Sequence, residues 1–598
     1  MLELGPWRML VGRGRRQVVL VGFIVAAVFL LVRQLQHPQP VSEVESWLRD
    51  AALIPKVDYN WLLLQRTDRK PAWPNYAGAK WHATTEQQHA LNQVIKAALL
   101  QRGKKGGAHK SRLWAERRLR VKAATKYAWD AYAHDAFGSD EYHPLSRRGE
   151  NMTQAGVGYF IADVLDTLLL IGLKDEYKQG RDHLAATLTF DQPGTVSLFE
   201  TTIRVLGGLL SAYHWSGETD AELLRLADEL GDRLAWSFGT PTGIPPETVQ
   251  LRPNGKPYAY MSSTAEIGTL QLEFRYLAKL TGKQKYRRYV DRVMNVMLKA
   301  PKYDGLAPIY MDATSGTFTG GEIRLGSRGD SYYEYLLKQW LQTRQSESQF
   351  RVEYDAAMEG VKRYLVTESP NQKLTYVGEL HHVAGDTPLF NPKMDHLVCF
   401  LAGNLALGAT KGRALSEIPP VQLSARDRED LILARELADT CVHMYFDTKT
   451  GLSPELVYFR HTDQATGEQV QFNKDDQLVL PEGDMLARSG DRHNLLRPET
   501  VESLFVLWRI TGEEKWREYG WRIFNAFEEW ARLPAGGFTS LRDITVVPPP
   551  REDKMETFFV SETLKYLYLL FSDSDPVPLT GYVFNTEAHP LPQFSWDE

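Results

Sequence analysis

One ten-residue pattern recurs along this 598-residue chain. Residues 277–286 read LAKLTGKQKY and residues 507–516 read LWRITGEEKW. Weaker copies occupy residues 168–177 (LLLIGLKDEY) and 209–223 (LLSAYHWSGETDAEL). Each copy is an apolar helical run, a glycine where a left-handed residue ends a helix, and a polar start to a second helix. Such units, spread over most of the chain, predict antiparallel helical hairpins arranged around a ring.

Strand signals are short and are limited to Gly- and Pro-rich pieces such as residues 305–321 and 450–471. A β/α barrel would need apolar strand runs between its helices, so we expect an all-α toroid of helical hairpins with short β-hairpins. Hydrophobic residues make up 43% and charged residues 24%, which excludes a largely disordered or multi-spanning chain. Lys and Arg (70) nearly balance Asp and Glu (75), which argues against nucleic-acid binding.

An apolar run near the amino terminus predicts a membrane anchor. Val18–Val32 is 15 residues without a polar side chain, slightly short for a spanning helix and at the upper limit of a signal-peptide core. Arginines precede the run and only Arg33 follows closely, so the positive-inside rule keeps residues 1–17 in the cytosol. No small-x-small cleavage site follows, so we expect a single-pass type II signal anchor at residues 18–35. A cleaved signal peptide is the alternative.

Residues 36–110 are predicted to form a lumenal stem. The segment 102–110 (RGKKGGAHK) is basic and glycine-rich and is interpreted as a flexible joint. Four tryptophans make the stem too aromatic for a solvated linker, so part of it is expected to pack on another region. In an oxidising lumen the two cysteines, Cys399 and Cys441, could pair, and Asn151 in Asn-Met-Thr would be a glycan acceptor.

Acidic residues recur at or near the start of otherwise apolar segments. They are Glu200, Glu266, Asp330, Glu499, Glu502 and Glu562. An apolar helix is buried on most faces, so its carboxylates are paired, face a cavity, or are costly. In a ring of hairpins the inner helices present their starts at one mouth, and these acids would converge on one pocket.

A structural alternative exists for each acid, because carboxylates in a first helical turn offset the helix dipole and cap free amides. The repetition of the pattern, with Arg204, Arg328 and Arg497 nearby in sequence, favours a pocket. Close acids raise one another's pKa and arginines lower it, so one site can supply a proton donor and a proton acceptor. Inverting sugar hydrolysis needs such a pair with room for one water between them.

Other motifs say less. The chain has no HExxH, EF-hand, P-loop or GxGxxG pattern. By spacing alone, His396 before an apolar helix is more typical of a structural histidine, and Thr586 lies in a predicted loop near the end of the domain. The 15 Trp and 27 Tyr suit carbohydrate binding, although a large core also needs aromatic residues.

At these residues the chain resembles the class I α-1,2-mannosidases of glycoside hydrolase family 47, over roughly residues 111–595. The segments that carry the resemblance are FETTIRVLGGLLSAY, AEIGTLQLEF, RGDSYYEYLLKQW, MDHLVCFLAGNLALG, LRPETVESL, ETLKYLYLLF and VFNTEAHP. The resemblance implies an (α/α)7 barrel with a Ca²⁺ ion at its base. It also implies inverting removal of terminal α-1,2-linked mannose from high-mannose N-glycans.

The same resemblance implies roles for individual residues. Glu200 corresponds to the general acid, acting through a water, and either Glu499 or Asp330 activates the attacking water; that choice stays open. Thr586 corresponds to the only direct protein ligand of Ca²⁺, with waters and sugar hydroxyls completing the shell. Cys399 and Cys441 match the disulfide of enzymatically active members. Further pocket positions are matched by Arg204, Glu266, His396, Arg497, Glu502, Phe558 and Glu562.

Arg328 bears on specificity within the family. Members of the endoplasmic reticulum resemble this chain in having Arg there, and the planar guanidinium can bond several sugar oxygens and restrict which branch enters. We therefore expect a monomeric enzyme of the endoplasmic reticulum membrane, lumenal in its catalytic domain, that trims one mannose from the nine-mannose glycan. The alternatives are a Golgi-type or secreted enzyme that trims to five mannoses, and a lectin-like degradation factor of the same fold.

Overall fold

Most of the described chain is helical. The computed structural model describes residues 71–73, 78, 80–101, 108–252, 257–383, 387–462, 478–479 and 483–597, which belong to one compact unit, Tyr59–Glu598. The predicted cytosolic tail and membrane anchor lie outside these residues. Within the described part of the chain, no helix combines the length and apolar character needed to cross a membrane.

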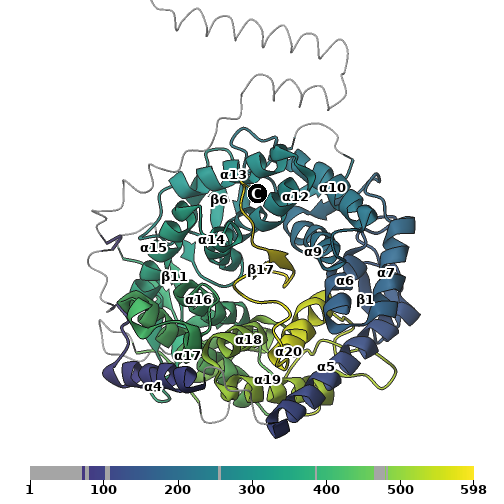
Figure 1. Ribbon diagram of the computed structural model, residues 1–598. Helices are drawn as coiled ribbons and strands as arrows, with labels where there is room; N and C mark the ends of the chain where they lie inside the picture. The colour runs from purple at the N-terminus through teal and green to yellow at the C-terminus, as the bar shows by residue number, and fades with distance from the viewer. Residues whose placement is uncertain are drawn as a thin grey trace, which may run out of the picture. The chain divides into compact units, whose positions relative to one another are not determined.

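An inner set of helices follows one another around a ring (Figure 1). In the described residues these helices are α6 (Tyr159–Ile171), α9 (Gly207–Trp215), α12 (Gln271–Thr281), α14 (Asp330–Gln342), α16 (Phe400–Thr410), α18 (Glu499–Thr511) and α20 (Leu564–Leu570). Each contacts the next, and α20 contacts α6, so the cycle closes. These helices are buried nearly all round, and every residue of α16 is buried, as expected for a helix that is apolar on all faces.

An outer helix packs on each inner one (Figure 1). In ring order the outer helices are α7 (Lys174–Thr187), α10 (Ala221–Ala235), α13 (Gln284–Lys299), α15 (Ser348–Tyr364), α17 (Ala425–Phe446), α19 (Glu514–Ala526) and α5 (Ala108–Asp135). The outer helices are amphipathic. In α13, for example, Val290, Val293, Met294 and Met297 are buried at helical spacing.

The recurring sequence pattern forms the junctions of these hairpins. Gly172, Gly282 and Gly512 end α6, α12 and α18 with φ of 77°, 71° and 70°, and Gly217 has φ of 85° between α9 and α10. A residue with a Cβ is strained in this left-handed conformation, which explains the glycine at the end of each copy. The predicted helix–glycine–helix units are therefore confirmed.

Short antiparallel strands precede most of the inner helices. They are β1 (Glu141–His143), β2 (Arg148–Glu150), β3 (Thr195–Ser197), β4 (Thr248–Gln250), β5 (Met261–Ser263), β6 (Tyr310–Asp312), β7 (Thr317–Thr319), β8 (Glu322–Ile323), β9 (Val366–Glu368), β10 (Thr375–Val377), β11 (Glu379–His381), β12 (Leu389–Asn391), β13 (Lys393–Asp395), β14 (Leu456–Phe459), β15 (Leu478–Val479) and β16 (Met485–Ala487). Short strands do occur in the two example regions, where β6, β7 and β14 lie, but further strands lie in segments that the sequence analysis did not single out. Most have three residues, too few to show the alternation that identifies a strand in sequence.

The last hairpin has a different position. Strands β17 (Tyr582–Phe584) and β18 (Pro590–Pro592) pair antiparallel after α20, and β17 lies inside the ring of helices (Figure 1). The loop between the two strands contains Thr586. The carboxyl-terminal segment thus contributes side chains to the centre of the molecule.

Part of the predicted stem packs on the helical region, as expected. Trp73 is buried and stacks on Tyr303 with ring centroids 4.9 Å apart, and helix α4 (Thr85–Gln101) contacts α17 and α18. Burying one such aromatic side chain contributes about 1.5–3 kcal/mol. The flexible joint predicted at 102–110 is wrong for its last residues, because α5 begins at Ala108. Residues 102–107 lie outside the described part.

Candidate active site

Two of the predicted acids follow the same local motif, a strand, a serine cap and a short helix. Ser197 Oγ accepts the Glu200 N–H (3.2 Å) and Ser263 Oγ accepts the Glu266 N–H (3.4 Å). The serines therefore satisfy the free amides of the helix starts. The glutamates are left to face the interior of the ring, and the Glu266 Oε2 atom is buried without a hydrogen-bond partner.

Glu200 lies where the helix changes pitch. The segment α8 (Leu198–Glu200) continues through a π-helical turn, η1 (Thr201–Leu206), into α9. Such turns occur often at functional sites, since they redirect side chains within a continuous helix. Here the Glu200 carboxylate accepts hydrogen bonds from Arg204 Nε (2.8 Å) and from the Tyr159 hydroxyl (3.4 Å).

Phe558 lies between two arginines from opposite sides of the site. The guanidinium carbons of Arg204 and Arg497 are 5.5 and 5.4 Å from the centre of its ring. Arg204 belongs to the Glu200 segment, and Arg497 immediately precedes α18, which starts at Glu499. The cation–π sandwich therefore joins the Glu200 and Glu499 sides of the site through one aromatic ring.

Glu499 is held ionised. His396 Nδ1 donates to Glu499 Oε2 (2.7 Å), while the hydroxyls of Tyr445 and Thr500 lie 2.8 and 3.0 Å from His396 Nε2. Burial opposes ionisation, but the His396 hydrogen bond and the charges of His396 and Arg497 more than offset it, and the pKa of Glu499 lies below its ordinary value. Glu499 can therefore accept a proton at neutral pH.

Asp330, the first residue of α14, favours the protonated form, unlike Glu499. Burial raises its pKa to about 8, a hydrogen bond from the Ser331 N–H (2.9 Å) offsets part of this, and the charges of Glu334, Asp395 and Glu499 raise it further. The interaction with Glu499 places the two carboxyls in one electrostatic environment. Without a cation nearby, Asp330 is protonated at neutral pH.

Glu502 and Glu562 complete the cluster of acidic side chains. Burial raises the pKa of Glu502 to about 8; Lys338 lowers it, and Glu334 and Glu499 raise it. Burial and the charge of Glu499 also raise the pKa of Glu562 well above its ordinary value. Burial raises the pKa of Glu266 to about 7. We call Asp330, Glu502 and Glu562 the mouth acids. Along the chain they are far apart, and the ring brings them together around Glu499.

Thr586 occupies the loop between β17 and β18. Its hydroxyl donates to Glu334 Oε2 (2.8 Å), and the buried Lys338 forms an ion pair with the other oxygen of Glu334. Because the proton points at Glu334, the lone pairs of the hydroxyl remain free for a cation. Lys338 and Glu502 also line a cavity with Tyr566.

The residues around Thr586 fit the calcium ion that the family resemblance implies. Ca²⁺ accepts many oxygen ligands in a flexible shell, and Thr586 offers its hydroxyl and its carbonyl oxygen. In the described part of the chain, no three His, Cys, Asp or Glu side chains are arranged to hold a metal. The buried carboxyls near Thr586 would favour a hard divalent cation.

Beneath this loop a second polar cluster is fully buried. His589 Nδ1 donates to Asp166 Oδ2 (3.0 Å) and His589 Nε2 donates to Asp163 Oδ1 (3.2 Å), while Lys565 Nζ donates to Asp166 Oδ2 (3.0 Å). Burial opposes charge on all of them, yet the two carboxylates raise the pKa of His589, and the pKa of Asp166 falls to about 2. We call Asp163, Asp166, Lys565 and His589 the buried network.

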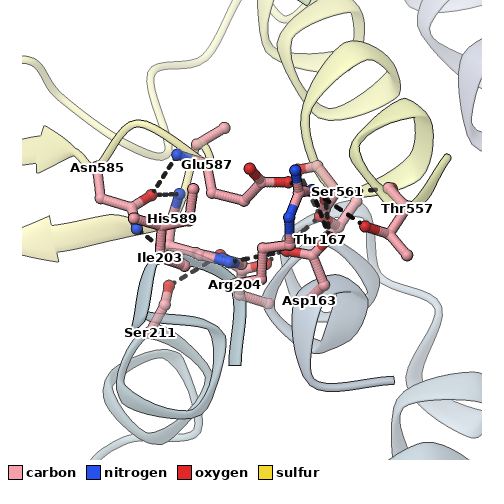
Figure 2. Close-up of polar contacts among 12 residues, drawn as sticks. Asp163, Thr167, Ile203, Arg204, Ser211, Thr557, Ser561, Asn585, Glu587 and His589 are labelled. Carbon is pink, nitrogen blue, oxygen red and sulfur yellow. Dashed lines mark hydrogen bonds and ion pairs between the residues drawn. The ribbon is translucent and has the colours of Figure 1, made fainter. Parts of the chain in front are cut away.

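The buried network also reaches Glu200. Ser561 Oγ donates to Asp163 Oδ2 (3.0 Å), and Arg204 Nη1, 3.6 Å from the same oxygen, forms an ion pair with Glu587 (Figure 2). Asn585 Nδ2 donates to the Ile203 carbonyl oxygen (2.9 Å). The loop that holds Thr586 is thereby fixed to the helix segment that carries Glu200.

Three further sequence predictions concern Arg328, the cysteine pair and Asn151. Arg328 is exposed and has φ of 72°; its guanidinium lies 5.5 Å from the Tyr310 ring centre and 3.7 Å from Glu247. The predicted disulfide is present, because Cys399 and Cys441 are bonded and join the residues after His396 to α17. Asn151 is exposed after β2, where a glycan could attach.

Sequence reasoning missed several residues of the site. They are Tyr159, Asp163, Asp166, Glu334, Lys338, Lys565, Glu587 and His589. The criterion of an acid within an apolar segment would have found some of them. Asp163 and Asp166 lie in IADVLDTLLLI, and Glu334 and Lys338 lie one helical turn apart in the apolar α14. No local pattern distinguishes His589, whose partners are more than 420 residues away.

The fold and the site together indicate a class of enzyme. Carboxyls of opposite protonation gathered inside a ring of helical hairpins are the kind of arrangement that acid–base catalysis by a glycoside hydrolase needs. The chain matches the Glycosyl hydrolase family 47 pattern over residues 124–593 and belongs to that family.

Named relatives agree with this assignment. The chain is 46% identical over 506 residues to mannosyl-oligosaccharide 1,2-alpha-mannosidase MNS3 of Arabidopsis thaliana, with 80% of this chain and 79% of the relative covered. It is 43% identical to the endoplasmic reticulum mannosyl-oligosaccharide 1,2-alpha-mannosidase of Rattus norvegicus, covering 81% and 70%. The solved alpha-1,2-mannosidase from Trichoderma reesei superposes with a TM-score of 0.71 at 28% identity, covering 80% and 99%.

Proposed function

We propose that the protein is an inverting α-1,2-mannosidase that removes terminal α-1,2-linked mannose from high-mannose N-glycans. The observation that carries this proposal is the pairing of an ionised Glu499, held by His396, with Glu200 across the Phe558 ring. Relatives that bear the name mannosyl-oligosaccharide 1,2-alpha-mannosidase support the substrate. We also propose that the closed cycle of helix pairs is an (α/α)7 barrel.

The proposed chemistry uses the two sides of the site differently. Glu499 accepts the proton of a water whose oxygen bonds to the anomeric carbon. Glu200, oriented by Arg204, donates a proton through a second water to the glycosidic oxygen as the carbon–oxygen bond breaks. Attack on the face opposite the leaving sugar inverts the configuration. Between Asp330 and Glu499, the lower pKa of Glu499 favours it as the base.

Thr586 is the proposed protein ligand of Ca²⁺, through its hydroxyl and carbonyl oxygens. When bound, the ion would supply positive charge and oxygen coordination for sugar hydroxyls among the acids. The role of this chain is to present Thr586 correctly: Glu334 accepts a hydrogen bond from the Thr586 hydroxyl, and Asn585 fixes the loop. The remaining pocket residues, Arg497 and Glu502 among them, are proposed to contact sugar hydroxyls.

We further propose that the enzyme resides in the membrane of the endoplasmic reticulum and trims one branch of the nine-mannose glycan. Relatives named for the endoplasmic reticulum in Rattus norvegicus and Saccharomyces cerevisiae support the location. Arg328, exposed beside the entrance, supports the restricted branch choice. The anchor at residues 18–35, a monomeric state and glycosylation of Asn151 remain predictions.

Product analysis tests the function and the specificity together. The purified full-length chain is incubated with nine-mannose glycan, and the products are separated as isomers. We expect one eight-mannose isomer, whereas progressive trimming to five mannoses would indicate the Golgi type. Arg328→Leu should shift the products from the single eight-mannose isomer toward progressive trimming to five mannoses. Binding of the glycan without any hydrolysis would support the lectin-like alternative and contradict the enzymatic proposal.

A further inference from the structure

Two tyrosines are exposed on the segment that leads into the site. Tyr258 and Tyr260 are 63% and 70% exposed, and the adjacent Met261 is 52% exposed. The two rings meet edge to face, with centroids 4.5 Å apart and planes at 83°. Among the large apolar side chains exposed in the described residues, these two alone are aromatic. Contiguous exposed apolar side chains are typical of a binding surface.

The backbone beneath the rings is held by a sheet. The Ala313 N–H donates to the Tyr260 carbonyl oxygen (2.8 Å), and Met261 pairs with Asp312 in the β5–β6 ladder. Strand β7 pairs with β6 on its other side, giving the order β5-β6-β7. Tyr260 is thus displayed from a fixed support, and the Tyr258 ring packs against it, which lowers the entropy cost of ordering the rings on ligand binding.

The same strand continues into the site. Three residues after Tyr260, Ser263 donates to the Arg328 carbonyl oxygen (3.3 Å) and caps the helix of Glu266. Tyr310, the ladder partner of Ser263, carries the Arg328 guanidinium over its ring. At about 3.3 Å per extended residue, Tyr260 lies roughly 10 Å and Tyr258 roughly 17 Å along the chain from Ser263.

Glu247 joins this wall to the acid side of the site. Its carboxylate lies 3.7 Å from Arg328, and its carbonyl oxygen accepts the Leu198 N–H (2.9 Å) at the start of the helix segment that carries Glu200. The surface from Tyr260 to Glu200 is therefore continuous through named contacts. A ligand that leaves the pocket past Arg328 meets the tyrosines.

We propose that Tyr258 and Tyr260 form a sugar-binding platform outside the catalytic pocket, which stacks against a mannose ring of the same branched glycan. The inference rests on the proposed function. Only one terminal mannose occupies the pocket, so the rest of the glycan must cross the rim. The C–H face of a pyranose ring packs on an aromatic face, while the tyrosine hydroxyls can bond sugar hydroxyls.

The surroundings favour a sugar over an apolar segment of polypeptide. Beyond Met261 the patch is bordered by the polar turn Asp312–Thr314–Ser315, in which Asp312 Oδ1 accepts the Thr314 N–H (2.7 Å). A stable protein contact would need a larger apolar area than two rings and one methionine. A platform with a polar border instead matches a ligand that has both C–H faces and hydroxyls.

The test compares two substrates in the full-length chain. Wild type, Tyr258→Ala/Tyr260→Ala and the matched control Tyr258→Phe/Tyr260→Phe are assayed with nine-mannose glycan and with an α-1,2-linked mannose disaccharide, which is too short to reach the platform. In the Ala variant we expect the ratio of kcat/KM for the glycan over the disaccharide to fall about three- to tenfold, the range of one or two aromatic contacts. The Phe variant keeps the rings and most of the ratio.

The outcomes separate the platform from the enzyme assignment. An unchanged ratio in the Ala variant contradicts the platform, as does an equal loss with both substrates, which would place the effect inside the pocket. A loss seen only when the glycan is attached to an unfolded glycoprotein would assign the tyrosines to polypeptide and also overturn the proposal. Wild-type protein that cleaves neither substrate would refute the proposed function itself, independently of the tyrosines.

Discussion

The buried network is completely withdrawn from solvent and the mouth acids are mostly withdrawn, yet the carboxyls of the two groups differ in charge. In the buried network, burial opposes ionisation of Asp163 and Asp166. His589 and Arg204 more than compensate at Asp163, as Lys565 and His589 do at Asp166, and both pKa values lie below their ordinary range. At the mouth, burial acts on Asp330, Glu502 and Glu562 with too few cations to offset it, and their pKa values rise.

This difference separates a structural site from a chemical one. A paired buried charge fixes the loop of Thr586 and the helix of Glu200 in place, because removing either partner leaves an uncompensated charge. Acids whose burial is only partly compensated can change their protonation or attract a cation at low energetic cost, which is what catalysis requires. Glu499 combines both properties, since it is paired with His396 among acids whose burial is not fully compensated.

The largest effect is expected for Glu499→Gln. Removing the proposed base should lower kcat by about 10²- to 10⁴-fold, while glycan binding is retained because the side chain keeps its shape. Glu513→Gln, which alters a glutamate paired with Arg435 away from the mouth, is the control and should act as wild type. Steady-state kinetics together with glycan binding by calorimetry measure both quantities. Near-normal turnover of Glu499→Gln would refute its assignment as the base.

Asp163→Asn should give the largest loss of stability. The change leaves the His589 imidazolium and the Arg204 guanidinium without a carboxylate that both face, so the free energy of unfolding should fall by about 3–5 kcal/mol. Asp130→Asn, which breaks an exposed pair with Lys126, should cost only about 0.3–0.5 kcal/mol. Urea denaturation monitored by tryptophan fluorescence compares them. Equal effects of the two substitutions would remove the distinction between network and surface.

Calcium bound at the proposed Thr586 site should raise the free energy of unfolding. At a hundredfold excess over its Kd, an ion that binds only the folded state adds about 2.7 kcal/mol to stability. Differential scanning calorimetry of chelator-treated protein, with and without added Ca²⁺, measures the shift in Tm, and activity lost on chelation should return with Ca²⁺. In Thr586→Val the hydroxyl is gone, and the shift should shrink strongly. An undiminished shift in this variant would place the ion elsewhere.

The smallest effect is expected in the pH dependence of the metal-free protein. Asp330 and Glu502 have folded pKa values of about 8, above their unfolded values, so the folded state binds more protons. Their contribution to stability is complete below about pH 4 and is lost as the pH rises through 8. Asp330→Asn should weaken this decrease of stability with rising pH, whereas Asp130→Asn should leave it unchanged. Denaturation at a series of pH values measures how the free energy of unfolding changes with pH. Stability that increases between pH 4 and 8 would contradict the raised pKa values of the mouth acids.

The two regions also differ in how well sequence reasoning found them. Acids at helix starts and the cysteine pair were recognised, because an acid in an apolar segment stands out locally. The buried network was missed, since the partners of His589 lie at Asp163 and Asp166, far along the chain. The strands before the inner helices were also underestimated, because three-residue ladders are stabilised by partners from other segments rather than by their own pattern.

The amino-acid sequence alone determined the features that depend on neighbours within a few residues. These are the glycines that end the helices, the serines that cap Glu200 and Glu266, and the apolar periodicity that makes hairpins. Tertiary structure decided which acids are charged, which arginines enclose Phe558, and where the Thr586 loop lies. Desolvation and Coulomb interactions depend on distance in space, and residues hundreds of positions apart set them only after the ring has closed.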